Sequence, residues 1–152
     1  MSTPIARVGR SSTGLGLFAA KPIARKAYIA SYRGRWIPTA QAQHRERRFG
    51  AKYMFEVNRQ WTIDGSSRRN LGRYINHSCR PNAVAVLRNR NMVIVALRDV
   101  APEEEITFDY GEEYVALYIE PSGCRCAACA SRGRSARKSR KRDRGRTSPS
   151  PA

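Results

Sequence analysis

The sequence feature that most constrains this chain is the segment 73–82, which reads RYINHSCRPN. Short polar side chains such as those of Asn and Ser hydrogen-bond to nearby backbone and favour turns over regular ladders. Pro81 has no backbone N–H and pushes Arg80 toward extended geometry, so the segment is expected to be irregular and fixed. Because a buried irregular segment must pair all of its polar groups, this pattern predicts a functional site; a capped surface turn is the alternative.

The sequence around this segment predicts many short strands separated by turns. Alternating or β-branched patterns indicate strands at residues 28–32, 53–57, 61–64, 83–87 and 92–97, and another strand begins at Ile106. The Asn-rich residues 88–91 predict that 83–87 and 92–97 form a hairpin. This pattern is typical of a mainly β fold built from several small sheets.

Two short helices are expected beside the strands. Thr39 is predicted to cap a helix that runs to about Arg48, and its basic sequence with little apolar face indicates a solvated insertion. A second helical stretch is expected from Glu112 to about Ile119.

The positive charge is concentrated at the C-terminal end of the chain. Its 152 residues suit one domain with a modest core. Residues 132–152 hold nine of the 29 Lys and Arg residues and one of the 12 acidic residues, which is +8 of the net +17. This tail cannot bury a core and is expected to be disordered. The remaining +9 still favours an acidic partner or surface.

Cysteine usage and the lack of long apolar runs indicate an intracellular protein. No apolar run approaches the ~18 residues of a membrane span, and no secretory signal follows Met1. Four cysteines in such a chain are expected to be reduced or metal-bound. Cys124, Cys126 and Cys129 form a Cys-x-Cys-x-x-Cys group, and one distant cysteine, Cys79, can complete a tetrahedral zinc site. Reduced thiols without metal are the alternative.

Several blocks occur in the order found in the SET-domain lysine methyltransferases, which the chain resembles. They are GLGLF at 14–18, YRG at 32–34, ID at 63–64, the segment 73–82, and EITFDYG at 105–111. The C-terminal cysteines resemble the post-SET zinc segment of that family, in which Cys79 takes the place of the fourth ligand. The resemblance implies a SET domain at 5–112, a post-SET segment at 113–131 and a basic tail at 132–152.

The resemblance also implies a fold and a reaction. The fold is the β-clip of SET domains, with small sheets and a C-terminal pseudoknot that joins the Asn76-His77 and Tyr110 segments. S-adenosylmethionine lies in one cleft, and the substrate lysine enters from the opposite face through a narrow channel. Methyl transfer to the amine is an in-line displacement in which positioning dominates. The lysine must arrive neutral, and both burial and the adjacent sulfonium lower its pKa from the ordinary ~10.4.

Residue roles follow from the same resemblance. Tyr110 matches the catalytic tyrosine, and Tyr32 and Phe108 match residues that line the lysine channel. Phe at position 108 leaves room for a bulkier methylated amine, which predicts di- or trimethylation. The residues implied for cofactor binding are Leu15, Gly16, Leu17, Tyr53, Arg73, Asn76, His77 and Tyr110.

Two other functions stay open from the sequence. A zinc-stabilised nucleic-acid-binding protein would use the tail at 134–146 to neutralise phosphates, although no aromatic residues interleave with the charges to stack bases. A catalytically inactive SET scaffold would bind a partner, although Asn76, His77 and Tyr110 are all present. The candidate substrates are a histone or a bacterial DNA-packaging protein. The expected location is the cytoplasm or nucleoid for a bacterial protein, and the nucleus or chromatin for a eukaryotic or host-targeted one.

Overall fold

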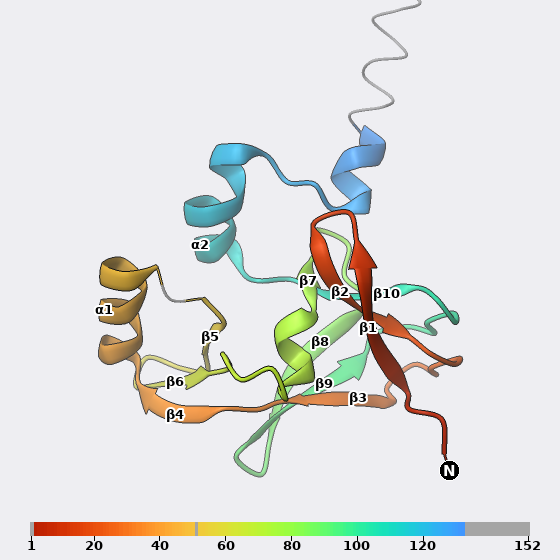
Figure 1. Ribbon diagram of the computed structural model, residues 1–152, viewed down its shortest axis with the longest axis horizontal. Helices are drawn as coiled ribbons and strands as arrows, with labels where there is room; N and C mark the ends of the chain where they lie inside the picture. Colours follow the sequence, from red (N-terminus) through yellow and green to blue (C-terminus); the bar gives the residue numbers. More distant parts are fainter. Residues whose placement is uncertain (1, 51, 133–152) are drawn as a thin grey trace, which may run out of the picture.

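The computed structural model describes residues 2–50 and 52–132 (Figure 1). Short strands predominate, as expected, with few helical segments between them. The strands are β1 (Ala6–Ser11), β2 (Gly14–Ala19), β3 (Tyr28–Tyr32), β4 (Arg35–Pro38), β5 (Met54–Glu56), β6 (Trp61–Asp64), β7 (Asn76–His77), β8 (Ala83–Arg88), β9 (Asn91–Ala96) and β10 (Glu105–Phe108). The helical segments are α1 (Thr39–Phe49), η1 (Leu71–Tyr74), α2 (Glu112–Tyr114), η2 (Val115–Ile119) and η3 (Glu120–Ser122).

The described strands form three small sheets, which confirms the predicted fold class. Their orders are β1-β2-β10-β7, β3-β9-β8 and β4-β6-β5. The predicted hairpin is β8–β9, in which Val84 pairs with Val95 and Arg88 with Asn91. Its turn places Asn89 and Arg90 at positive φ, a conformation that Asn tolerates better than most residues. The tail expected to be disordered lies, from residue 133 onward, outside the described residues.

Strand β10 joins the two sequence blocks that define the site. It pairs antiparallel with β2 through Glu105 and Phe18, and parallel with β7 through Phe108 and His77. β7 belongs to the segment 73–82, so this segment lies directly against the block 105–111. The juxtaposition that the family resemblance implied is therefore present.

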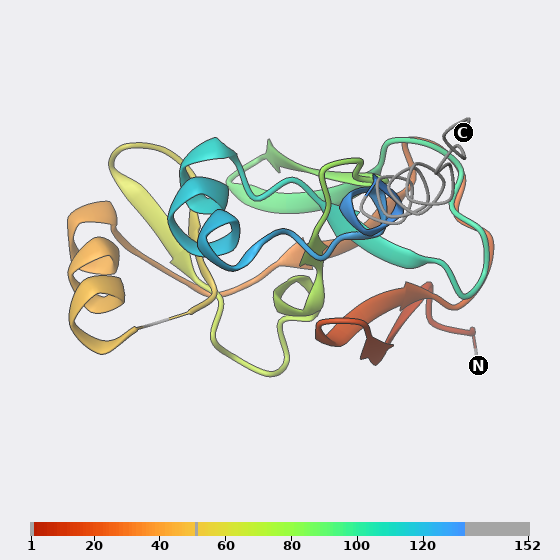
Figure 2. The same cartoon turned by 90° about the horizontal axis from the view of Figure 1, so that it is seen from above.

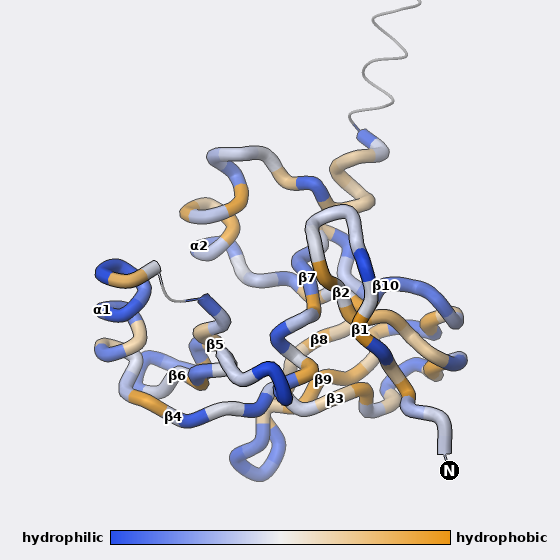
Figure 3. The backbone as a smooth tube through the Cα atoms, in the orientation of Figure 1, coloured by the Kyte–Doolittle hydropathy of each residue, from blue (hydrophilic) through white to orange (hydrophobic). Residues whose placement is uncertain are grey.

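The core lies between the sheets and is mainly aliphatic, with Tyr32 and Phe108 at its edge toward the site. Leu17, Ile63, Ile75, Ile94 and Ile106 are at most 1% exposed, and such burial contributes about 1.5–3 kcal/mol per side chain. In Figure 3 hydrophobic residues gather on the central strands, while the turn between β8 and β9 is hydrophilic. The core therefore supports the two strands, β7 and β10, that carry the site.

Helix α1 lies at one end of the molecule, away from the β1–β2 hairpin (Figures 1 and 2). The predicted capping role of Thr39 is wrong. Pro38 is the N-cap and makes no side-chain capping bond, and the Thr39 hydroxyl instead donates to the Asn58 carbonyl oxygen at 3.0 Å. Thr39 thus fastens α1 to the turn between β5 and β6. No helix in the described ranges is long and apolar enough to cross a membrane.

Candidate active site and metal centre

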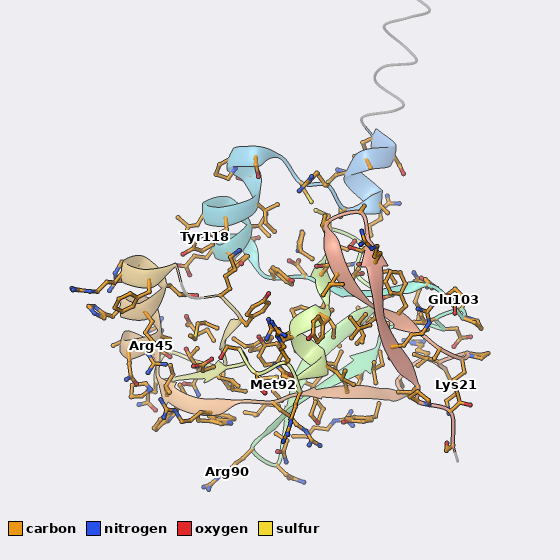
Figure 4. All side chains as sticks on the ribbon, in the orientation of Figure 1. Lys21, Arg45, Arg90, Met92, Glu103 and Tyr118 are labelled. Carbon is orange, nitrogen blue, oxygen red and sulfur yellow. The ribbon has the colours of Figure 1, made fainter. Side chains whose placement is uncertain are left out.

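A cavity of about 840 Å³ opens between α1, β5, η1 and the helical segment that begins at Glu112. Figure 4 shows Arg45 on α1 and Tyr118 on the C-terminal helical segment on the same side of the molecule. Five residues predicted from the sequence line this cavity together: Tyr32, Tyr53, Arg73, Phe108 and Tyr110. They come from four separate stretches of the chain, since Phe108 and Tyr110 share the block 105–111, so the fold brings distant residues into one place.

Tyr110 is held at both its hydroxyl and its backbone. The hydroxyl donates to the carbonyl oxygen of Ile75 at 2.6 Å, and the backbone N–H donates to Nδ1 of His77 at 3.2 Å. Burial, together with the neighbouring phenols of Tyr114 and Tyr53, raises the pKa of Tyr110 far above its ordinary value. The phenol therefore stays neutral and cannot serve as a base near neutral pH, but its oxygen lone pairs can accept a hydrogen bond inside the cavity.

Tyr32, which also lines the cavity, is likewise held by a hydrogen bond from its hydroxyl to a backbone carbonyl. Its hydroxyl donates to the Tyr53 carbonyl oxygen at 2.8 Å. A Cβ added to Gly72 would come within 2.7 Å of the Tyr32 ring, so only glycine allows this close approach. Burial, with a further contribution from Tyr110, raises the pKa of Tyr32. Two neutral, oriented phenols thus face one cavity.

Phe108 sits in a continuous series of aromatic rings that leads from the core to the surface. Its ring centroid lies 6.0 Å from that of Phe55 and 5.2 Å from that of Tyr110. The series continues from Tyr110 to Tyr114 at 5.1 Å and from Tyr114 to Tyr118 at 4.8 Å. These rings form apolar walls that suit the methylene chain of a lysine.

Arg73 and Tyr53 form a polar corner of the cavity. The Arg73 guanidinium lies 4.0 Å from the Tyr53 ring centroid, within the range of a cation–π contact. The Arg73 Nε is buried and is the one buried side-chain nitrogen or oxygen in the described part of the chain without a hydrogen-bond partner. An unpaired buried donor is costly, and an anionic group such as the carboxylate of a methyl donor would satisfy it.

The other residues predicted to bind the cofactor do not line this cavity and lie where β2 and β7 flank β10: Leu15, Gly16, Leu17, Asn76 and His77. The Asn76 side-chain amide donates to the Leu15 carbonyl oxygen at 3.0 Å and to Oε1 of Glu105 at 2.7 Å. A Cβ on Gly16 would come within 2.5 Å of the same Glu105 oxygen. Leu17 is fully buried between β1 and β10 and anchors β2 in the core.

Glu105 was not singled out from the sequence, because the predicted strand begins one residue later, at Ile106. Glu105 is the first residue of β10; its carboxylate accepts a hydrogen bond from Asn76 and lies against Gly16 of β2. Its position three residues before Phe108, inside the block 105–111, was the available signal.

His77 uses both of its ring nitrogens within the protein. Nδ1 accepts from the Tyr110 N–H, and Nε2 lies 3.4 Å from Sγ of Cys79. Burial lowers the pKa of His77, and the carboxylate of Asp109, 3.6 Å from Nδ1, opposes this shift only in part. Because Nδ1 accepts a hydrogen bond, the ring is in its neutral form.

The four predicted metal ligands form one cluster. The sulfur atoms of Cys79, Cys124, Cys126 and Cys129 all lie within 4.8 Å of one another. The Cys79 sulfur is 3.8 Å from that of Cys124 and 3.7 Å from that of Cys129. Zn–S bonds of ~2.3 Å in a tetrahedron require sulfur atoms roughly 3.8 Å apart, so this geometry fits structural zinc.

The thiol chemistry fits a divalent cation as well. Burial and hydrogen bonds with the other thiols raise the pKa of Cys79 to about 12. Burial also disfavours the thiolate of Cys126, but backbone N–H groups of Cys79 and Cys129 outweigh it and lower its pKa to about 6. Four sulfurs this close can ionise together only if a cation supplies the opposing charge, which is what zinc does.

Acidic residues that the sequence did not single out also line the cavity. They are Glu46, Glu56, Asp109, Glu112 and Glu113, which are five of the chain's 12 acidic residues, against three of its 29 Lys and Arg residues. Burial, together with the neighbouring Glu56, raises the pKa of Glu46. The cavity thus has the opposite charge balance to the rest of this basic chain.

Comparisons with known proteins agree with the fold and the site. Over 127 residues the chain is 37% identical to "Histone-lysine N-methyltransferase, H3 lysine-4 specific" of Saccharomyces cerevisiae, covering 78% of this chain and 12% of that protein. The Debaryomyces hansenii protein of the same name is 35% identical over the same length, with 78% and 12% covered. The chain therefore spans about an eighth of the length of these relatives.

Solved structures show the same fold. The Chaetomium thermophilum polycomb repressive complex 2 contains a chain that matches with a TM-score of 0.68 and 27% identity, over 77% of this chain and 16% of that one. "ctPRC2 in an autoinhibited conformation bound to S-adenosylmethionine" matches with a TM-score of 0.64 and 28% identity, over 72% and 15%. The family model for the SET domain matches residues 14–111, more than half of the chain. With the cysteine cluster that follows the domain, these matches show that this chain belongs to the SET-domain family.

Proposed function

We propose that this chain is a protein-lysine N-methyltransferase that uses S-adenosylmethionine. The observation that carries the proposal is the 840 Å³ cavity, which is lined by two buried, neutral tyrosines and by Arg73, whose buried Nε has no partner within the described residues. The tyrosine hydroxyls suit the amine of a substrate lysine. The Arg73 guanidinium suits the carboxylate of the methyl donor.

The role proposed for the protein is to position the methyl donor and the lysine amine for in-line transfer. S-adenosylmethionine supplies the methyl group as a sulfonium. Tyr110 and Tyr32 accept hydrogen bonds from groups at the reaction centre, because both hydroxyl protons are already donated to backbone carbonyls. The aromatic walls exclude water and favour the neutral lysine amine, the form with a free lone pair. Donor binding is assigned to Arg73, Asn76, Tyr53 and the first residues of β2, 14–16.

The proposed substrate is a lysine within a basic protein segment. The acidic residues at the cavity favour lysine and arginine side chains on either side of the target, and Tyr114 and Tyr118 offer ring faces to cations. A histone tail has this chemistry, and the names of the relatives make histone H3 the first candidate. A chromatin location follows if the substrate is a histone.

The assay that tests the proposal is transfer of a labelled methyl group. The protein is incubated with labelled S-adenosylmethionine and either core histones or a host lysate, and the labelled lysine is mapped by mass spectrometry. Lysine labelling that depends on the intact protein supports the proposal. If neither histones nor lysate are labelled while the protein binds the donor, the protein is instead a catalytically inactive SET scaffold.

We predict that Phe108→Tyr shifts the product toward monomethyl-lysine. Phe108 is 7% exposed and its ring packs against Phe55 and Tyr110. An added hydroxyl would occupy channel volume, and would hold a water, that a methylated amine otherwise uses. Mass spectrometry after long incubation should show di- or trimethyl-lysine for the wild type and chiefly monomethyl-lysine for the variant. A wild type that stops at monomethyl-lysine would contradict the assignment.

We predict that replacing two cavity carboxylates weakens substrate binding. Glu112→Gln together with Glu113→Gln should raise KM for a basic peptide about 2- to 30-fold at low salt, because each of the two exposed ion pairs contributes ~0.2–1 kcal/mol. The effect should shrink as ionic strength rises. Glu120→Gln is the matched control, since Glu120 belongs to the same helical region but does not line the cavity. Equal KM changes in both proteins would argue against a role for the cavity charge.

A further inference from the structure

The imidazole of His77 lies between the tyrosine site and the cysteine cluster. Strand β7 places His77 opposite Phe108 of β10, and the side chain is only 6% exposed. Its ring centroid lies 5.5 Å from that of Tyr110 in an edge-on arrangement. Buried on this boundary, the ring has one nitrogen directed to each site.

The two hydrogen bonds fix which nitrogen carries the proton. The Tyr110 N–H is a donor, so Nδ1 of a neutral ring must be the acceptor, and the ring hydrogen is therefore on Nε2. Nε2 lies 3.4 Å from the Cys79 sulfur, so this hydrogen points to a predicted metal ligand. A neutral imidazole has one donor and one acceptor, and both are used.

We infer that His77 is a positioning residue that couples the metal centre to Tyr110. Through Nε2–H it donates to the Cys79 thiolate, and through Nδ1 it holds the backbone of the residue whose hydroxyl faces the cavity. Any contribution of His77 to donor binding then comes from its backbone, because its side chain is fully engaged. Zinc at the four cysteines and the placement of Tyr110 thus depend on the same ring.

A hydrogen bond to a ligating thiolate stabilises its negative charge and orients the sulfur. Loss of such partners beside a metal commonly costs 10–100-fold in metal affinity or activity. The coupling rests on the fit of zinc to the cysteine cluster. It does not depend on which substrate the protein modifies.

Two substitutions separate the two hydrogen bonds. In His77→Asn the side-chain oxygen can replace Nδ1, so the contact with Tyr110 is kept and the donor to Cys79 is lost. In His77→Gln the side-chain amide can replace Nε2–H, so the donor to Cys79 is kept and the contact with Tyr110 is lost.

Zinc release and amide exchange are the two readouts. Zinc transfer from the full chain to a chromogenic chelator should be 10- to 100-fold faster for His77→Asn and within about 2-fold of wild type for His77→Gln. Exchange of the Tyr110 backbone amide should accelerate only in His77→Gln. Equal zinc release from both variants, fast or slow, would overturn the coupling.

A measurement on the wild type covers the case in which a variant does not fold. Nitrogen NMR of the zinc-loaded protein should show His77 as the neutral tautomer protonated at Nε2. In cadmium-substituted protein, a scalar coupling from this proton to cadmium should be visible across the sulfur. A ring protonated at Nδ1 would refute the inference. All of these readouts are independent of methyl transfer, so failure of the proposed function would not affect them.

Discussion

Replacing Tyr110 by phenylalanine is expected to reduce the methyl-transfer rate about 10²- to 10³-fold, the usual loss when one oriented polar group is removed from a reaction centre. The hydroxyl is buried, neutral and bonded to the Ile75 carbonyl oxygen. Removing it takes away the lone pairs that face the cavity while leaving the ring. The expected result is a lower kcat measured with labelled methyl donor, with donor affinity changed much less.

The same substitution should also cost some stability. The Ile75 carbonyl loses its side-chain partner in a buried position, a penalty of about 1–3 kcal/mol. Rates are therefore compared well below the Tm of the variant, with circular dichroism to check the fold. Tyr28→Phe is the matched control, because this exposed tyrosine on β3 does not line the cavity. Unchanged turnover in Tyr110→Phe would remove Tyr110 from the reaction.

The second large effect is expected from loss of the metal centre. Cys124→Ser should lower bound zinc from about one ion per chain to well under half, and should destabilise the segment 124–129, which the cluster ties to Cys79. Binding free energies of structural zinc reach about 10–16 kcal/mol in small domains. Because His77 connects the cluster to Tyr110, methyl transfer should fall at least about tenfold as well.

Metal analysis after purification without chelators measures the zinc content, and thermal unfolding measures the stability. Arg125→Ala is the control: it changes the same short loop but removes no sulfur. Chelation should bring the wild type to the behaviour of Cys124→Ser and leave that variant unchanged. Wild-type protein that contains no zinc would contradict the assignment of the cluster.

Local patterns were sufficient to predict part of the fold. The β8–β9 hairpin follows from two β-branched runs and an Asn-rich turn, and α1 begins and ends close to the expected residues. Spacing also brought out the three cysteines at 124–129. These features are determined by residues close together in the chain, so they can be predicted from local sequence patterns.

Long-range contacts explain what the sequence did not reveal. Strand β7 has only two residues and exists because β10 pairs with it. Thr is a residue type that often caps helices, but the Thr39 hydroxyl instead donates to the carbonyl oxygen of Asn58, 19 residues away. No local pattern singles out Glu105, and only the fold shows that its carboxylate accepts a hydrogen bond from Asn76. The roles of the matched site residues came from family resemblance, because related proteins share long-range contacts that one sequence does not show.

The central place of β10 has a consequence for how the protein folds. Phe18 and Glu105 are paired although they are 87 positions apart (105 − 18), so closing this loop costs about 4 kcal/mol of chain entropy before the contacts form. Hairpins such as β1–β2 and β8–β9 close far more cheaply and are expected to form first. A chain arrested at that stage would have much of its secondary structure, an unpaired edge on β2, and no assembled site. The slow step in folding is thus expected to be the one that assembles the proposed methyl-transfer site.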